Sequence, residues 1–261
     1  MQIAEVLNGM TMSKKERLDL ILSEKYPEYS RRQIQSWIMQ GKARVDGQVQ
    51  TKPGTILNPS LPIELIVEEP KFVSRAGFKI EAALNKFDID VTNLVVMDAG
   101  LSTGGFTDCM LQRGARKVYG VDVGYGQVHE KICNDDRVIV MERTNLRHLE
   151  TVGEPVDLVT LDLSFISIIK VMDAVCRILK PDGRLLVLIK PQFEAPRGSV
   201  NRRGVIKDEA LREQVVNSVV DGIKVFGFSF QGIVDSPIFG AQGNKEFVAY
   251  FERILGDDRV E

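Results

Sequence analysis

The chain contains 261 residues, of which 44% are hydrophobic and 27% are charged, and its formal net charge is −2. This length and apolar content are sufficient for a buried core in one large and one small domain. The longest apolar runs, such as residues 185–189, have the length of a β-strand, and the N-terminus lacks the basic start and apolar stretch of a signal peptide. The sequence therefore argues against a membrane protein or a membrane partner, and we expect a cytoplasmic location.

Basic residues are concentrated near the start of the chain. Residues 13–55 contain nine Lys and Arg residues against five Asp and Glu residues, so this segment carries a formal charge of +4 and the rest of the chain −6. The basic segment therefore has the character of a separate module. The three cysteines share no metal-ligand spacing, and no metal site is predicted.

The first predicted element is a short helix. Residues 1–12 match no pattern and are expected to form a leader, which can be disordered. Apolar residues then recur at helical spacing at Leu18, Ile21 and Leu22, which predicts an amphipathic helix over residues 14–22.

A second helix is predicted over residues 31–38. Ser30 is a favourable N-cap for it, and Gly41 is placed to end it. Arg31 and Arg32 fall in its first turn, where positive charges oppose the helix dipole. Helix stability alone does not explain this pair, and bound phosphates explain it better.

A β-hairpin follows these helices. Residues 43–49 form two short alternating runs around Asp46 and Gly47, which is the sequence signal of a tight hairpin turn. Two helices and a hairpin make one unit, which we place at residues 13–70.

This unit resembles the S4 RNA-binding module over most of residues 15–67. The resemblance is carried by Arg17-Leu18-Asp19, Ser30-Arg31-Arg32, Gly41-Lys42-Ala43-Arg44-Val45-Asp46-Gly47 and Lys52-Pro53-Gly54. It implies a positive surface that meets folded RNA through phosphates and shape, lined by Arg17, Arg31, Arg32, Gln33, Lys42 and Arg44. The alternative is an ordinary solvated charged face.

From residue 71 to residue 255 the sequence alternates strands and helices, which predicts an α/β domain with a mostly parallel sheet covered on both faces. The predicted strands are residues 94–97, 117–121, 138–141, 157–161, 185–189, 227–234 and 246–251. Ligands of such sheets bind outside the carboxyl ends of the strands.

A glycine loop follows the first of these strands. Gly100, Gly104 and Gly105 permit backbone angles and close ligand approach that a Cβ would forbid, and the helix expected near Gly105 points free N–H groups at the ligand. The spacing D-x-G-x-x-x-G-G differs from the G-x-G-x-x-G of dinucleotide-binding folds. Asp122 follows the next strand, where a carboxylate can accept both hydroxyls of a ribose. Together these features predict an adenosine-type cofactor. Taken alone, the glycine loop is equally compatible with an ordinary tight turn, and Asp122 with a solvated loop residue.

Charged residues from distant segments are expected to meet at one edge of the sheet. Asp98, Asp122, Asp162 and Lys190 all lie at or just past the carboxyl end of a strand. Glu246 begins the last strand, and it reaches the same edge if that strand runs antiparallel to the others. The alternative for Lys79, Asp162, Lys190 and Glu246, each taken singly, is a surface ion pair.

The whole arrangement resembles the TlyA, or haemolysin A-like, family of ribosomal RNA 2′-O-methyltransferases, which join an S4 module to an FtsJ-like catalytic domain. The resemblance runs from about residue 14 to residue 253 and is carried by residues 74–79, 98–108, 121–124, 162–167, 189–194 and 243–247. It implies a Rossmann-like S-adenosylmethionine-dependent methyltransferase fold with a mostly parallel sheet and an antiparallel last strand. It also implies ribosomal RNA or ribosomal subunits as partners, with a cytidine ribose as the target.

The resemblance assigns roles to individual residues. The family's catalytic tetrad falls on Lys79, Asp162, Lys190 and Glu246. Binding of S-adenosylmethionine falls on Asp98, Gly100, Ser102, Thr103, Gly104, Gly105, Phe106, Asp122, Val123, Asn145 and Asp162. Arg143 or Thr144 would serve the adenine contact as well as Asn145. One departure is Leu101, where a smaller residue is expected.

Within the tetrad, Lys190 is assigned to the ribose hydroxyl. It acts as a general base if neutral, or stabilises the developing alkoxide if charged, while Asp162 and Glu246 orient the two lysines. Residues 194–204 are rich in Arg, Gly and Pro and are interpreted as a mobile substrate-binding loop, with a plain connector as the alternative.

Three other functions agree less well with the sequence. A pore-forming haemolysin lacks support, because no spanning segment or long interfacial helix is visible. A non-catalytic ribosome-binding factor would keep the S4 surface but lose the tetrad or the glycine loop, and both are intact. An NAD-linked oxidoreductase is disfavoured by the glycine spacing. The sequence predicts no oligomeric state.

Overall fold

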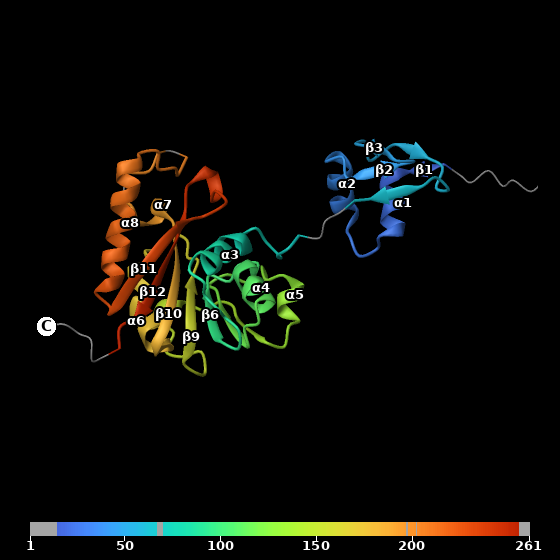
Figure 1. The fold of residues 1–261 in the computed structure, drawn as a ribbon. Coiled ribbons are helices and arrows are strands. Elements are labelled where there is room, and N and C mark those ends of the chain that lie inside the picture. Colours follow the sequence, from blue (N-terminus) through green and yellow to red (C-terminus); the bar gives the residue numbers. More distant parts are fainter. Residues whose placement is uncertain (1–14, 67–69, 197, 202, 256–261) are drawn as a thin grey trace, which may run out of the picture. The chain divides into compact units, whose positions relative to one another are not determined.

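The computed structural model describes residues 15–66, 70–196, 198–201 and 203–255. The chain divides into two compact units, Met1–Glu69 and Pro70–Glu261 (Figure 1). The leader predicted for residues 1–12 lies outside the described residues. No helix within the described ranges is long and apolar enough to cross a membrane.

In its described residues, 15–66, the first unit contains two helices and two small sheets. Its elements are β1 (Glu16–Arg17), α1 (Leu18–Lys25), α2 (Arg31–Met39), β2 (Ala43–Val45), β3 (Gln48–Gln50), β4 (Ile56–Leu57) and β5 (Ile63–Leu65). A capping box between Ser30 and Gln33 starts α2, and β2 and β3 form the predicted hairpin. Asp46 and Gly47 have φ angles of 50° and 74°, as a tight hairpin turn requires.

The first helix begins later than its apolar pattern predicts. Glu16 and Arg17 form a short strand that pairs with β4 in antiparallel fashion, so α1 starts at Leu18 rather than at residue 14. This difference has a long-range cause, because the partner strand lies about 40 residues further along the chain.

A buried carboxylate holds the two helices of this unit together. Asp19 is fully buried, and its oxygens accept hydrogen bonds from Arg17 Nε (2.9 Å), Arg31 Nη2 (2.9 Å) and Gln35 Nε2 (2.6 Å). Burial alone would raise the pKa of Asp19, but the hydrogen bonds from Arg17, Gln35 and Arg31 outweigh it and hold that pKa below its ordinary value of 3.8. The charge of Arg31 in the first turn of α2 therefore has a partner inside the protein.

We expect Asp19→Asn to destabilise the first unit by about 2 kcal/mol at pH 7, because a charged hydrogen-bond acceptor is lost. Since folding lowers this pKa, the contribution of Asp19 is present above pH 3.8 and is lost as the pH falls further. Denaturation followed by fluorescence of Trp37, the single tryptophan, measures this unit within the whole chain. The exposed carboxyl of Asp46 supplies the control Asp46→Asn, and equal stability of the two variants would contradict the assignment.

The second unit is a seven-stranded sheet covered by helices. Its strands are β6 (Val95–Ala99), β7 (Lys117–Val121), β8 (Val138–Met141), β9 (Val156–Leu161), β10 (Leu179–Ile189), β11 (Phe228–Asp235) and β12 (Phe247–Arg253). Its helices are α3 (Ala76–Lys86), α4 (Gly105–Gln112), α5 (Glu130–Cys133), α6 (Met172–Ile178), α7 (Pro191–Glu194) and α8 (Glu209–Lys224), with 3-10 turns at η1 (Leu146–His148), η2 (Ile168–Val171) and η3 (Ala241–Gly243).

The strand order is β11-β12-β10-β9-β6-β7-β8, and β12 runs antiparallel to both of its neighbours. The antiparallel direction predicted for the last strand is thereby confirmed. Strand β10 is longer than predicted, because residues 179–184 extend it toward its N-terminal end.

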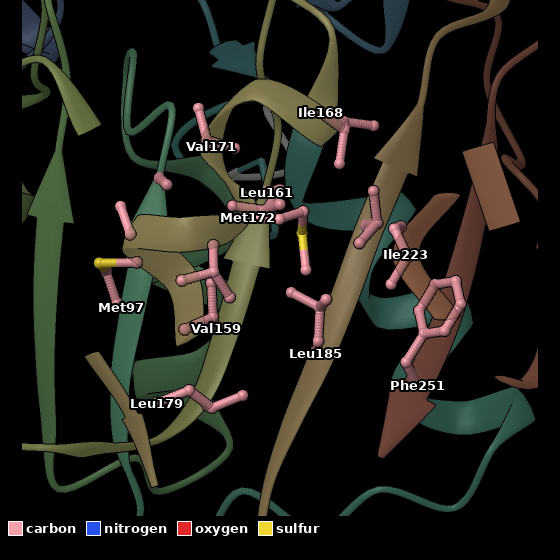
Figure 2. Packing of buried hydrophobic residues seen from close by; sticks show 14 of the residues in the cluster. Met97, Val159, Leu161, Ile168, Val171, Met172, Leu179, Leu185, Ile223 and Phe251 are labelled. Atoms are coloured by element: carbon pink, nitrogen blue, oxygen red, sulfur yellow. The ribbon is translucent and has the colours of Figure 1, made fainter. Parts of the chain in front are cut away.

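Alternating residues of the strands build a core layer on each face of the sheet. Met97, Val159, Leu185 and Phe251 pack on one face with apolar residues of α6 and α8 (Figure 2). Residues of the opposite parity pack against α3 and α4. Burial of both faces fixes the register of each strand, and the register in turn fixes which side chains reach the carboxyl edge.

Candidate active site

The glycine loop adopts a backbone that side chains would obstruct. Gly100 has a φ of 91°, and a Cβ at this position would collide with the carbonyl oxygen of Asp162. Gly104 has a φ of 92°, caps the start of α4, and would place a Cβ 2.8 Å from Ile132. The loop is therefore packed between two neighbouring segments, and only glycine fits at these two points.

Asp98 of β6 is a buried residue next to the glycine loop. Its carboxylate is almost fully buried and accepts hydrogen bonds from the amide (3.1 Å) and hydroxyl (2.6 Å) of Thr107 and from the hydroxyl of Thr160 (3.0 Å). Burial raises the pKa of Asp98 to about 6, although the hydrogen bonds from Thr107 and Thr160 oppose the rise. Asp98 lines neither of the two cavities described below, and its predicted contact with the cofactor stays a prediction.

Asp122 lies at the end of β7 and faces the loop. Its Oδ2 accepts a hydrogen bond from the Ser102 amide and its Oδ1 accepts one from the Gly124 amide, both at 2.7 Å. Two backbone donors thus hold the carboxylate in one orientation. Each oxygen keeps a second lone pair for a ligand hydroxyl.

Two cavities adjoin at the carboxyl edge of the sheet. The larger has a volume of about 330 Å³, and its lining includes Gly100, Ser102, Asp122, Val123, Asn145, Asp162 and Phe165. The smaller, of about 130 Å³, is lined by Ser74, Ala76, Gly100, Leu101, Ser102, Thr103, Gly105, Phe106 and Asp162. Gly104 lines neither cavity and shapes the loop instead. The larger volume is within the range of small-molecule sites.

These cavities fit an adenosine-type cofactor. The larger one places a fixed carboxylate where a ribose would lie, and Asn145 contributes to its wall while capping η1. In the smaller one, the hydroxyl of Ser74 is buried without a hydrogen-bond partner among the described residues. That hydroxyl lies against Gly105 at the start of α4, in space that a Cβ would fill. A polar ligand group is the partner that this arrangement lacks.

The four predicted catalytic residues form two ion pairs at the same edge. Lys190 Nζ lies 2.5 Å from Asp162 Oδ1, and Lys79 Nζ lies 2.5 Å from Glu246 Oε2. The pairing of Ile189 with Phe247 sets Lys190 and Glu246 side by side at the ends of β10 and β12. All four side chains are at least 85% shielded from solvent. The structure therefore brings together residues that lie up to 167 positions apart.

The rim beside Lys190 contains residues to which the sequence analysis assigned no role. Ser164 accepts a hydrogen bond from Lys190 Nζ at 2.9 Å. Phe165 is 89% exposed and has a φ of 64°. Its ring lies 4.7 Å from the ring of Phe193. An exposed aromatic residue in a left-handed backbone is costly, which points to a binding role. The sequence signal that could have identified Phe165 is its position within residues 162–167, a segment that carries the family resemblance.

Glu246 is fixed by a neighbouring glycine. A Cβ at Gly240 would collide with the Glu246 carboxylate, so this glycine makes room for the ion pair with Lys79. Leu101, the one departure from the family pattern, is accommodated in a similar way. Its side chain packs over Gly120 of β7, where a Cβ would lie 2.6 Å away. The larger residue is therefore matched by a missing side chain on the neighbouring strand.

The predicted RNA-binding residues divide into two groups in the first unit. Arg17 and Arg31 are both engaged with Asp19, although about half of each side chain is exposed. Arg32 and Arg44 are exposed and form no ion pair with any residue in the described part of the chain. Gln33 is exposed and belongs to the capping box, and Lys42 is half-buried.

Comparison with known proteins matches both units. Residues 72–253 match the family described as FtsJ-like methyltransferase, and residues 16–63 match the S4 domain. The chain is 40% identical to the 16S/23S rRNA (cytidine-2'-O)-methyltransferase TlyA of Mycobacterium tuberculosis. The 239 matched residues cover 90% of this chain and 89% of the relative. The chain belongs to the TlyA, or haemolysin A-like, family of FtsJ-like methyltransferases.

Other members of the TlyA family are similarly close. Hemolysin A of Brachyspira hyodysenteriae is 41% identical over 239 residues, which cover 90% of this chain and 99% of the relative. A solved structure described as "Putative hemolysin from Streptococcus thermophilus" has 36% identity and a TM-score of 0.70 over 93% of this chain and 90% of that chain. The predicted fold, a methyltransferase-type α/β domain preceded by an S4 domain, is confirmed.

Proposed function

We propose that this protein transfers a methyl group from S-adenosylmethionine to a cytidine ribose 2′-hydroxyl in ribosomal RNA, the target named for its relatives. This proposal rests on two ion pairs shielded from solvent, Lys190–Asp162 and Lys79–Glu246. They lie beside the larger cavity at the same edge of the sheet. Support comes from the TlyA relative, which is named as a cytidine-2'-O-methyltransferase of 16S and 23S rRNA.

In this proposal, the adenosine part of the cofactor would lie in the larger cavity and its amino-acid end in the smaller one. S-adenosylmethionine would supply an electrophilic methyl group. Asp122 would accept the ribose hydroxyls of the cofactor, and Asn145 would lie near its adenine. The loop from Gly100 to Phe106, together with the Ser74 hydroxyl, would hold the amino-acid end.

The tetrad would act on the hydroxyl of the RNA. Asp162 and Ser164 hold the Lys190 side chain in place, so its ammonium is oriented before the substrate arrives. In this position it would stabilise the alkoxide that develops as the hydroxyl loses its proton. The Lys79–Glu246 pair joins α3 to the start of β12 and adds a second fixed dipole. Positioning of the hydroxyl supplies much of the remaining rate.

Phe165 would provide a stacking surface for the target base. We expect Phe165→Ala to lower kcat/KM for RNA about tenfold, because one base–aromatic stacking contact is lost. Phe165→Trp keeps an aromatic face and should keep most of the activity. Because Phe165 also lines the larger cavity, the affinity for S-adenosylmethionine is measured in parallel by calorimetry. An equal loss in both variants would argue against stacking.

Arg32 and Arg44 would contact phosphates of the RNA. We expect Arg32→Ala combined with Arg44→Ala to weaken RNA binding and to reduce the slope of log K against log salt by about 2. Arg31 is left intact, because its loss would also remove a hydrogen-bond donor from the buried carboxylate of Asp19. Filter binding of ribosomal RNA at several salt concentrations measures the slope, and Lys86→Ala, which removes an exposed lysine of α3 in the second unit, is the control. An unchanged slope would contradict this surface.

The proposed function is tested by transfer of labelled methyl from S-adenosylmethionine to ribosomal subunits from cells that lack this protein. Alkali-resistant label in the RNA is the expected result, because 2′-O-methylation blocks cleavage at the modified nucleotide. Absence of label on every ribosomal substrate, despite cofactor binding, would favour a non-catalytic RNA-binding factor.

A further inference from the structure

A third cavity lies beside Gln242 of η3, the turn that precedes Glu246 in the chain. It has a volume of about 640 Å³ and is lined by Asn201, Arg203, Val205, Lys207 and Gln242. Arg203 and Lys207 are both exposed, so two cations border a single open cavity.

The charges of these two residues are available to a ligand. Neither Arg203 nor Lys207 forms an ion pair with a residue in the described ranges. The acidic residues that follow them in the chain are already engaged. Asp208 accepts a hydrogen bond from the Leu211 amide at the start of α8. Glu209 lies 3.5 Å from Arg212 and 3.6 Å from Lys245. A cavity with two uncompensated cations favours an anion.

Side-chain hydrogen bonds fix the backbone at Arg203 and Val205, beside the cavity. The Asn201 side chain accepts hydrogen bonds from the amides of Arg203 (2.8 Å) and Val205 (3.0 Å). Gly204 has a φ of 74°, which glycine adopts at low cost. The turn therefore presents the cations on a preorganised frame, which reduces the entropy lost when a ligand binds.

A buried side chain connects this turn to the catalytic edge. Asn244 is 3% exposed; its Nδ2 donates to the Gly204 carbonyl at 2.8 Å, and its Oδ1 accepts from the Ile206 amide at 3.2 Å. The Asn244 carbonyl also accepts from the Gly240 amide at 2.9 Å. Gly240 in turn packs against the Glu246 carboxylate. The cation-bearing turn and Gly240, which packs against the catalytic carboxylate, are thus joined by hydrogen bonds through Asn244.

We propose that Arg203 and Lys207 bind a backbone phosphate of the RNA strand beside the methylated ribose, and that Asn244 is a positioning residue that sets this phosphate site relative to Glu246. A phosphodiester matches the charge of the cavity, and its position along the strand would place the neighbouring ribose at the tetrad. This inference rests on the proposed function, because it assigns part of the substrate to the same edge of the sheet.

The phosphate site is tested with Arg203→Ala combined with Lys207→Ala. We expect KM for ribosomal subunits to rise at least tenfold, kcat to stay within about twofold, and the salt slope of RNA binding to fall by about 2. Affinity for S-adenosylmethionine should be unchanged. Lys86→Ala with Lys224→Ala removes two remote charges as a matched control. A wild-type KM and salt slope, or a loss confined to kcat, would overturn the proposal.

The positioning role is tested with Asn244→Asp, which preserves shape but removes the donor to Gly204. We expect kcat to fall and KM for RNA to rise together, because the phosphate site and Gly240, which packs against Glu246, lose their link through Asn244. A fall in cofactor affinity with unchanged KM for RNA would overturn this role.

Failure of the phosphate site and failure of the proposed function give different results. If the wild-type protein methylates no RNA but the Arg203→Ala, Lys207→Ala variant still loses salt slope, the proposed reaction is wrong and the phosphate site stands. If methylation occurs and the variant behaves as wild type, only the phosphate site is wrong.

Discussion

Lys190→Ala is expected to reduce methyl transfer to ribosomal RNA by about 10³-fold, because it removes the one ammonium held beside Asp162 and Ser164. Lys190 lines neither the larger nor the smaller cavity, so the affinity for S-adenosylmethionine should change less than twofold. Single-turnover transfer of labelled methyl, with calorimetry of cofactor binding on the same preparations, separates the two quantities.

The control is Lys86→Ala, which removes an exposed lysine of α3 that forms no ion pair with a described residue. It should transfer methyl groups at the wild-type rate. If Lys190→Ala turned over at a rate close to that of this control, the role assigned to Lys190 would be wrong. If both activity and cofactor affinity fell together, Lys190 would act on the cofactor site and not on the substrate hydroxyl.

The edge of the sheet was predictable because parallel strands place their carboxyl ends together. Asp122, Asp162 and Lys190 each follow a strand, and that order alone predicts a shared site. Glu246 required one further assumption, the antiparallel direction of the last strand, which the pairing of β10 with β12 confirms. The local signals of α2 were also sufficient, since Ser30 and Gln33 form its capping box within three residues.

Contacts between distant segments were not predictable from local pattern. The charge of Arg31 was attributed to phosphate, but its nearest partner is Asp19 in the preceding helix. The hydrogen bonds that Thr107 and Thr160 donate to the Asp98 carboxylate were likewise not visible in the sequence. In each case the side chain's partner depends on how elements pack, which residue type and spacing do not specify.

Gly100→Ala is expected to weaken binding of S-adenosylmethionine about 100-fold. The new Cβ would collide with the carbonyl oxygen of Asp162, so the loop and the end of β9 must move apart. A displacement of about 1 Å at such a site is enough for a loss of this size. Asp162 also pairs with Lys190, and methyl transfer should therefore fall further than cofactor affinity.

The matched control separates this collision from backbone strain. Gly227 has a similarly positive φ of 84°, but a Cβ there would meet no atom within 4 Å. Gly227→Ala should therefore lose about 1–2 kcal/mol of stability, as Gly100→Ala also does from strain alone, but bind the cofactor normally. Calorimetric titration and thermal unfolding of both variants give the comparison. Equal cofactor affinity in the two would mean that the contact between Gly100 and Asp162 does not shape the cofactor site.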